Sequence, residues 1–333
     1  MQTKSQPSPN QTRTGVRKVR IDAEQAGQRV DNFLRRELPG LPKGRLYRLL
    51  RRGEVRVNGG RVKADYKLAA GDELRIPPVT LESGPAAPSA ATAASLLSRI
   101  VFEDRDLLVL DKPPGLAVHG GSGLSHGAIE LLRAARPELR DLSLAHRIDR
   151  ETSGCLVFAK RRSVLRQLHE SFRCGEVAKN YLALVHGDWQ FGERRIDRPL
   201  LVSHGKSGER HVVVSSGGKP DVTHVRLSRL YPGYSLLQCS PETGRTHQIR
   251  VHLADAGHAI AGDERYSAES DQILASSPRP PRLFLHAQSI SFLDSRGNDR
   301  LFTASIPEDL QRFLGRLERA FKGDGQARRR GGR

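Results

Sequence analysis

The sequence has few cysteines, and their spacing excludes two classes of small stabilised domain. Its 333 residues contain three, Cys155, Cys174 and Cys239, without a Cys-x-x-Cys pair. An odd number of widely spaced cysteines does not make a complete disulfide framework and does not match a zinc ribbon. Each lies in or near an apolar stretch, so we interpret all three as packing residues. Because the cytosol keeps thiols reduced, this pattern favours a cytoplasmic protein.

Long apolar runs are also missing. No stretch approaches the roughly 20 apolar residues that a membrane-spanning helix needs. The first 20 residues are polar and contain no apolar segment of the kind found in signal peptides. We therefore expect neither a membrane partner nor export from the cell.

Acidic residues are scarce relative to basic ones. The chain has 37 Asp and Glu against 55 Lys and Arg, a net charge of +18, and an isoelectric point of about 10.5. An excess of this size favours a polyanionic partner, because neutralising phosphates releases condensed counterions. With a membrane disfavoured, nucleic acid is the expected partner.

Composition divides the chain into five segments. Residues 1–17 are rich in Ser, Thr, Gln and Pro and are expected to form a disordered tail. Residues 18–78 are patterned like a compact domain, and residues 79–98, rich in Ala, Ser and Pro, are expected to form a flexible linker. A second domain is expected over residues 99–321, followed by a basic tail over residues 322–333.

The first domain has two helical patterns followed by short strands. Residues 29–38 and the run after Pro42 have apolar residues at helical spacing. Asn58-Gly59 predicts a tight turn between two strands. The second helix carries four arginines around its apolar face: Arg45, Arg48, Arg51 and Arg52. This order of elements resembles the S4 RNA-binding domain, which implies that the four arginines contact RNA; the alternative is a solvated charged face.

The second domain contains many strand-like runs and fewer helical ones. Strand patterns occupy residues 107–110, 155–160, 181–186, 211–215, 222–230, 235–240 and 289–292. Helical patterns occupy residues 125–136, 163–173, 246–256 and 308–319. This mixture predicts an α+β domain with a mainly antiparallel mixed β-sheet and flanking helices.

The most informative stretch is residues 146–154, directly before one of the predicted strands. Asp149 stands between Arg147 and Arg150, and nearby cations favour an ionised carboxylate. An ionised and positioned carboxylate can act as a nucleophile toward a sugar carbon. An Asx-turn or a salt bridge that holds the loop is the alternative interpretation.

Several collinear motifs resemble one enzyme family. Residues 146–154 resemble the HRLDRxTSG signature of the RluA-type pseudouridine synthases, and Asp149 falls on the family's nucleophile. Further motifs follow the family's order at residues 110–115, 179–181, 243–252, 257–263 and 282–287. The resemblance covers residues 100–314, and together with the S4-like segment it is greatest to members that modify large-subunit ribosomal RNA.

The resemblance implies roles for residues around Asp149. In this family the aspartate either attacks C1′ of the ribose or abstracts a sugar proton to give a glycal, and both pathways remain open. Tyr181 corresponds to the aromatic residue on which the uracil stacks. Arg250 corresponds to the basic residue that pairs with the aspartate, and Arg147 to the residue that fills the space left by the flipped base.

Other residues are expected to contact RNA or shape the site. Arg245 is assigned to phosphate binding, and Ile249 to an apolar wall of the pocket. His146, Arg150 and Lys112 are assigned to RNA binding because they lie in the motifs; His146 is also expected to brace the Asp149 loop.

The implied reaction needs no cofactor. Breaking the N1–C1′ bond of uridine and joining C5 to C1′ moves no net electrons and loses no group, so neither a redox cofactor nor a metal is expected.

The expected partner is 23S ribosomal RNA or the pre-ribosomal large subunit, and the expected oligomeric state is a monomer. Alternatives are a synthase for transfer RNA or another ribosomal helix, a non-catalytic RNA-binding protein, and a glycoside hydrolase. The last normally needs a second cooperating acid.

Overall fold

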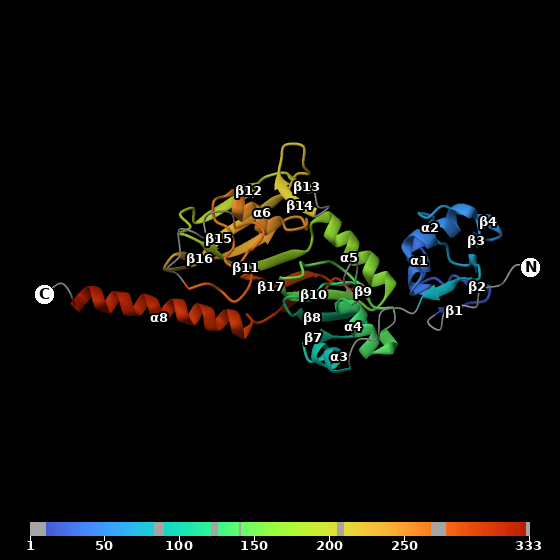
Figure 1. Cartoon of the computed structure of the whole chain (residues 1–333), viewed down its shortest axis with the longest axis horizontal. Helices are drawn as coiled ribbons and strands as arrows, with labels where there is room; N and C mark the ends of the chain where they lie inside the picture. Colours follow the sequence, from blue (N-terminus) through green and yellow to red (C-terminus); the bar gives the residue numbers. More distant parts are fainter. Residues whose placement is uncertain are drawn as a thin grey trace, which may run out of the picture.

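The computed structural model places a small N-terminal domain beside a larger domain built on one extended sheet (Figure 1). It describes residues 11–82, 90–120, 126–139, 141–204, 210–267 and 278–330. Within these ranges, no helix combines the length and the apolar character that crossing a membrane requires.

The N-terminal domain packs two helices on a four-stranded sheet. The helices are α1 (Val30–Glu37) and α2 (Lys43–Arg52). The sheet has the order β2 (Arg17–Arg20), β5 (Glu73–Ile76), β3 (Arg56–Val57) and β4 (Gly60–Arg61). Both turn residues between β3 and β4 have positive φ, 50° at Asn58 and 79° at Gly59, as the Asn-Gly pair predicted. The apolar stripes of both helices form the core, which confirms the predicted S4 arrangement.

The larger domain is organised around a ten-stranded sheet within the described residues. Its main path runs β12 (Glu193–Asp197), β15 (Val222–Tyr231), β16 (Tyr234–Pro241), β11 (Ala178–His186), β17 (Leu285–Leu293), β10 (Ser153–Ala159), β8 (Leu107–Lys112) and β7 (Ile100–Glu103). Strand β18 (Asp299–Thr303) pairs with β17, and β9 (Ser143–Leu144) pairs with β10. The pairs are antiparallel except β10 with β17, so the predicted mainly antiparallel α+β sheet is confirmed.

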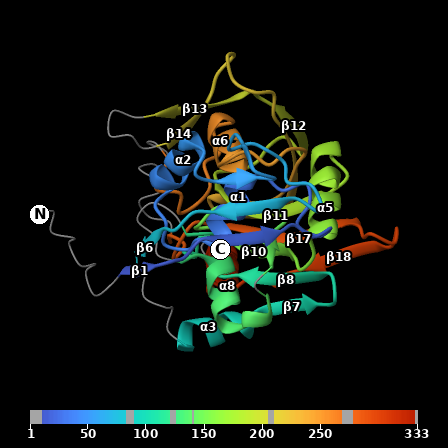
Figure 2. The same ribbon diagram turned by 90° about the vertical axis from the view of Figure 1, so that its right-hand side faces the viewer.

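Helices cover both faces of the central strands (Figures 1 and 2). All seven residues of β10 are buried. Alternate side chains of β10 pack against α4 (Ala128–Ala135) on one face and against α5 (Arg162–Cys174) on the other. Helix α6 (Gln248–Asp255) adds Ile249 and Leu253 to the core over β11 and β16. This layering fixes the ends of β10, β11 and α6 relative to one another.

Segments that were expected to lack structure contain regular elements. Strand β1 (Gln11–Arg13) pairs with β6 (Thr80–Glu82), so the predicted tail and the predicted linker meet in a small sheet. The linker also contains α3 (Ala90–Leu97), in which Ala is a strong helix former and Leu96 is buried. Helix α8 (Glu308–Arg330) continues into the predicted basic tail. Residues 1–10, 83–89 and 331–333 lie outside the described part of the chain.

Candidate active site

The loop that carries Asp149 connects β9 to β10 and is fixed by hydrogen bonds from the buried side chain of Lys112. A hydrogen bond of 3.2 Å from the Thr152 amide to the Asp149 carbonyl closes a turn. The ammonium group of Lys112 donates to three backbone carbonyls, those of Pro113 (2.9 Å), Leu116 (2.9 Å) and Arg150 (3.0 Å). The expected RNA contact of Lys112 is wrong, because its side chain is fully buried.

Gly154 determines how closely β10 approaches β17. Its φ is +112°, and a Cβ atom at this position would lie 2.2 Å from the carbonyl oxygen of Ala287. No other residue type fits such an approach without moving a strand. Ala287 pairs with Gly154 on one side and with Tyr181 of β11 on the other. Asp149, five residues before Gly154, and Tyr181 therefore meet at the same end of the sheet.

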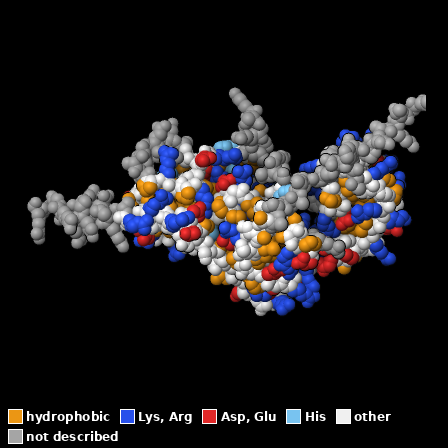
Figure 3. Space-filling model, turned by 60° about the horizontal axis from the view of Figure 1, so that its bottom comes forward, with side chains coloured by type: hydrophobic (Ala, Val, Ile, Leu, Met, Phe, Trp, Pro, Cys, Tyr) orange, Lys and Arg blue, Asp and Glu red, His pale blue; other side chains and the backbone are white. Residues whose placement is uncertain are grey.

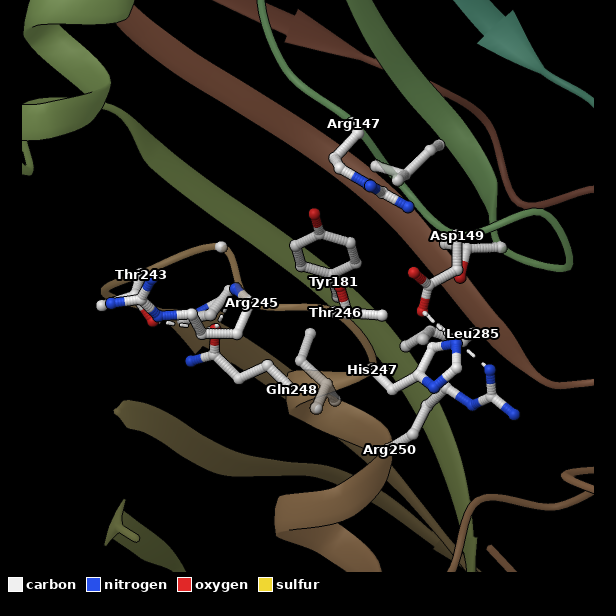
Figure 4. A pocket seen from close by; sticks show the side chains of 15 residues that line it. Arg147, Asp149, Tyr181, Thr243, Arg245, Thr246, His247, Gln248, Arg250 and Leu285 are labelled. Atoms are coloured by element: carbon white, nitrogen blue, oxygen red, sulfur yellow. Dashed lines mark hydrogen bonds and ion pairs between the residues drawn. The ribbon is translucent and has the colours of Figure 1, made fainter. Parts of the chain in front are cut away.

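Helix α6 brings two more groups to the Asp149 carboxylate (Figure 4). The Nη1 atom of Arg250 and the Nε2 atom of His247 each lie 4.0 Å from Asp149 Oδ2. Arg250 is held by Asp263, which accepts hydrogen bonds from its Nε (2.7 Å) and Nη2 (2.8 Å). The side chain of Asp149 is 18% exposed, whereas that of Arg250 is 9% exposed and that of Asp263 is fully buried.

The electrostatics single out Arg250 as the cation beside Asp149. Burial opposes the charged form of Arg250, but the hydrogen bonds and charge of Asp263, together with the charge of Asp149, raise its pKa. Burial lowers the pKa of His247 to about 4 despite the nearby carboxylate, so its ring is neutral at pH 7. The sequence also predicted that Arg147 and Arg150, which flank Asp149 in the chain, are cations next to its carboxylate, and this prediction is wrong. Arg150 pairs with Glu151 at 2.8 Å, and no described contact joins Arg147 to Asp149.

Asp149, His247 and Arg250 line a cavity with about 490 Å³ of open space. The ring of Tyr181 stands in it, with Ile249 and Leu285 as apolar neighbours. Burial raises the pKa of the Tyr181 hydroxyl, which therefore stays protonated at neutral pH. Figure 4 shows Arg147 on the side of the cavity opposite the Asp149 partners, and Arg245 at one end. Both arginines are exposed, so both can reach a bound polyanion.

His146 faces the protein interior. Its Nε2 accepts a hydrogen bond of 3.1 Å from the amide of Val157, and its ring packs against Phe172. The expectation that it braces the loop matches these contacts, whereas the expected RNA contact does not. Burial lowers the pKa of His146 to about 4.

This shift predicts a loss of stability in acid. Because the pKa of His146 is about 4 in the folded protein and about 6.5 when unfolded, the unfolded chain binds more protons between these values. The free energy of unfolding is therefore not reduced by His146 above pH 6.5, and it falls as the pH drops toward 4. His146→Gln keeps an acceptor for Val157 but does not titrate. In urea unfolding, the wild type should lose about 2 kcal/mol more than this variant between pH 7 and pH 4.5; equal losses would contradict the prediction.

The four arginines predicted on the N-terminal domain all lie on the solvent face of α2. Arg45, Arg48, Arg51 and Arg52 are exposed. In the view of Figure 3, Lys and Arg side chains are spread over both domains rather than gathered in one patch. The basic surface therefore extends well beyond the cavity.

Comparison with known proteins agrees with this geometry. The sequence profile described as RNA pseudouridylate synthase matches residues 106–255, and that of the S4 domain matches residues 28–74. Ribosomal large subunit pseudouridine synthase C of Escherichia coli (strain K12) is 50% identical over 311 residues, 92% of this chain and 98% of that protein. The protein of the same name from Salmonella typhimurium is 51% identical over 312 residues, with the same coverage.

The chain belongs to the RNA pseudouridylate synthase family. The family's solved structures include the human RNA pseudouridylate synthase domain containing 4, which superposes with a TM-score of 0.57 at 25% identity over 69% of this chain and 96% of that chain. Membership makes the chain an RNA pseudouridine synthase and an isomerase, as the motifs indicated.

Three residues that contact Asp149 or Arg250 were not predicted from the sequence to act in the site. Asp263, which holds Arg250, was noted only as part of a closing motif. His247 has no role in the site predicted from the sequence, although its Nε2 lies 4.0 Å from Asp149 Oδ2 and its φ is 56°. Tyr266 was missed: its hydroxyl lies 2.8 Å from His247 Nδ1, and its ring lies under the guanidinium of Arg250 at 5.0 Å. The available signal was the Gly262-Asp263 motif, whose turn brings Asp263 and Tyr266 to α6.

Proposed function

We propose that this chain isomerises specific uridines of large-subunit (23S) ribosomal RNA to pseudouridine, with Asp149 as the nucleophile. The observation that carries the proposal is a partly exposed carboxylate in a cavity beside a buried arginine whose own geometry is fixed by a second acid. The relatives that match over nearly the whole chain act, by name, on the ribosomal large subunit. We further propose that the protein acts in the cytoplasm as a monomer.

The proposed chemistry follows from the arrangement around Asp149. A uridine flipped into the cavity would bring its C1′ to the Asp149 carboxylate, whose Oδ2 lies 4.0 Å from Arg250 Nη1. Attack at C1′ breaks the N1–C1′ bond, and its electrons stay on the uracil. The uracil then turns and its C5 attacks C1′, which forms the C5–C1′ bond and breaks the bond between C1′ and Asp149. The C5 proton then leaves and N1 takes up a proton. The glycal pathway begins instead with removal of a sugar proton by the same carboxylate.

Other side chains would retain the RNA and the detached uracil. The ring of Tyr181 and the side chain of Ile249 offer an apolar surface on which a free base can remain. Arg147 is long and exposed enough to occupy the stack that the base leaves, while Arg245 and the arginines of α2 would bind phosphates. Proteins that bind a specific RNA sequence mainly contact loops, because the unstacked bases of a loop can turn outward.

Tyr181→Phe should lower turnover without weakening the binding of RNA. The variant keeps the ring for stacking but loses the hydroxyl, which we propose helps to remove the C5 proton. We expect turnover to fall about 100-fold, the lower end of general acid–base contributions, with little change in RNA affinity. Tyr231→Phe, which removes the hydroxyl of a buried tyrosine that does not line the cavity, is the matched control and should leave turnover unchanged. Equal turnover of the two variants would remove Tyr181 from the proton transfer.

The proposal itself is tested on ribosomal RNA. Purified protein is incubated with large-subunit RNA that lacks pseudouridine, and modified positions are mapped. We expect pseudouridine at a few uridines with retained RNA mass, because isomerisation releases nothing. Release of uracil would indicate a glycoside hydrolase, and binding without any modification would indicate a non-catalytic RNA-binding protein. Modification of transfer RNA alone would overturn the choice of substrate.

A further inference from the structure

Arginines gather where the N-terminal domain meets the larger domain. One end of α5 points toward the N-terminal domain in Figure 1. From that domain, Arg36 of α1 reaches across to Asp141, with its Nη1 3.3 Å from Oδ1. In the other direction, Arg166 of α5 donates from Nη1 to the carbonyl of Ala26 at 3.1 Å. These two contacts join the domains through guanidinium groups on both sides.

A third arginine at this junction has no counter-charge. Arg162 is the first residue of α5, one helical turn before Arg166. Among the described residues no acid pairs with it, and its buried Nε has no hydrogen-bond partner. Burial, followed by the charges of Arg36 and Arg166, lowers the pKa of Arg162. Asp141 pairs with Arg36 but no acid pairs with Arg162, so a further anion at this place would stabilise the half-buried guanidinium of Arg162.

We propose that Arg36, Arg162 and Arg166 bind a phosphate of the RNA backbone and thereby fix the N-terminal domain on the catalytic domain. Guanidinium forks match the geometry of phosphate oxygens. The N-terminal end of α5 adds the partial positive charge of the helix to the same place. The phosphate comes from RNA because this inference rests on the proposed function, in which RNA is the substrate. The site is separate from the cavity around Asp149 and is shared by both domains.

The test compares three variants of the full chain in binding to a large-subunit RNA fragment over a range of salt concentrations. Arg162→Gln removes the unpaired guanidinium. Arg173→Gln on the same helix removes an exposed arginine that pairs with Glu170, and serves as the matched control for charge. Asp141→Asn weakens the contact between the domains without removing a cation. We expect Arg162→Gln to weaken binding about tenfold at 0.15 M salt and to lower the salt slope by about 0.7 to 0.9.

The control variants distinguish a phosphate-binding site from contacts that only hold the two domains together. Neither Asp141→Asn nor Arg173→Gln should weaken the binding of RNA. If Arg162→Gln binds like Arg173→Gln, or if Asp141→Asn weakens binding while Arg162→Gln keeps the wild-type salt slope, the phosphate site is refuted. Pseudouridine formation by the wild type is followed on the same RNA. Its absence would refute the proposed function, whereas its presence with unchanged binding by Arg162→Gln would refute only this inference.

Discussion

Replacing Asp149 by Asn is expected to abolish pseudouridine formation and to leave RNA affinity nearly unchanged. The amide has almost the same size but carries no charge and is both a poor nucleophile and a poor base. Attack at C1′ and removal of a sugar proton are therefore both lost. Removing a nucleophile typically lowers turnover by about four orders of magnitude or more. RNA affinity should persist because the arginines that we propose to bind phosphates lie elsewhere. Single-turnover assays with saturating enzyme, together with filter binding, measure the two quantities.

Glu151→Gln is the matched control for this experiment. Glu151 lies two residues from Asp149, but it is exposed and pairs with Arg150 at the surface. We expect its turnover to stay within about twofold of the wild type, because exposed ion pairs contribute little. If Asp149→Asn converts uridine at a rate comparable to that of Glu151→Gln, Asp149 is not the nucleophile.

The sequence predicted the elements of the site better than their contacts. Strong periodicity located β10, β11 and α6, and the motif placed Asp149 in the loop before β10. The partner of Asp149 was harder to derive from local pattern, because charge spacing pointed to neighbours such as Arg150. That residue instead turns to Glu151 at the surface, and Arg250 reaches Asp149 from a helix 100 residues away. The family resemblance, rather than local spacing, identified Arg250.

Burial explains the remaining differences. A lysine in a motif of a basic protein suggests RNA contact, yet Lys112 finds three carbonyl acceptors inside the fold. Low-complexity composition suggested a linker at residues 79–98, yet part of it forms α3, because Leu96 packs against the core and Ala favours helix. The composition of a segment indicates how exposed its residues are on average, whereas tertiary packing determines whether a particular side chain is buried.

Asp263→Asn should lower turnover about 100-fold although Asp263 does not line the cavity. Asp263 fixes Arg250 through two hydrogen bonds and also accepts the amides of Arg265 and Tyr266. Without its charge, Arg250 is free to shift relative to Asp149, and misplacement by about 1 Å can have an effect of this size. Removing one partner of a buried ion pair should also lower the free energy of unfolding by about 3 kcal/mol. Assays are therefore run well below the melting temperature of the variant.

A double-mutant cycle distinguishes positioning from general destabilisation. Arg250→Lys keeps the charge but loses the two-pronged contact with Asp263. If Asp263 acts through Arg250, the double variant Arg250→Lys/Asp263→Asn should be little slower than Arg250→Lys alone, whereas independent effects would multiply. Asp309→Asn is the control, because it breaks a two-pronged but more exposed pair with Arg282, whose Nε lies 2.7 Å from Asp309. It should lower stability and leave turnover intact; a loss of turnover equal to that of Asp263→Asn would attribute both effects to folding.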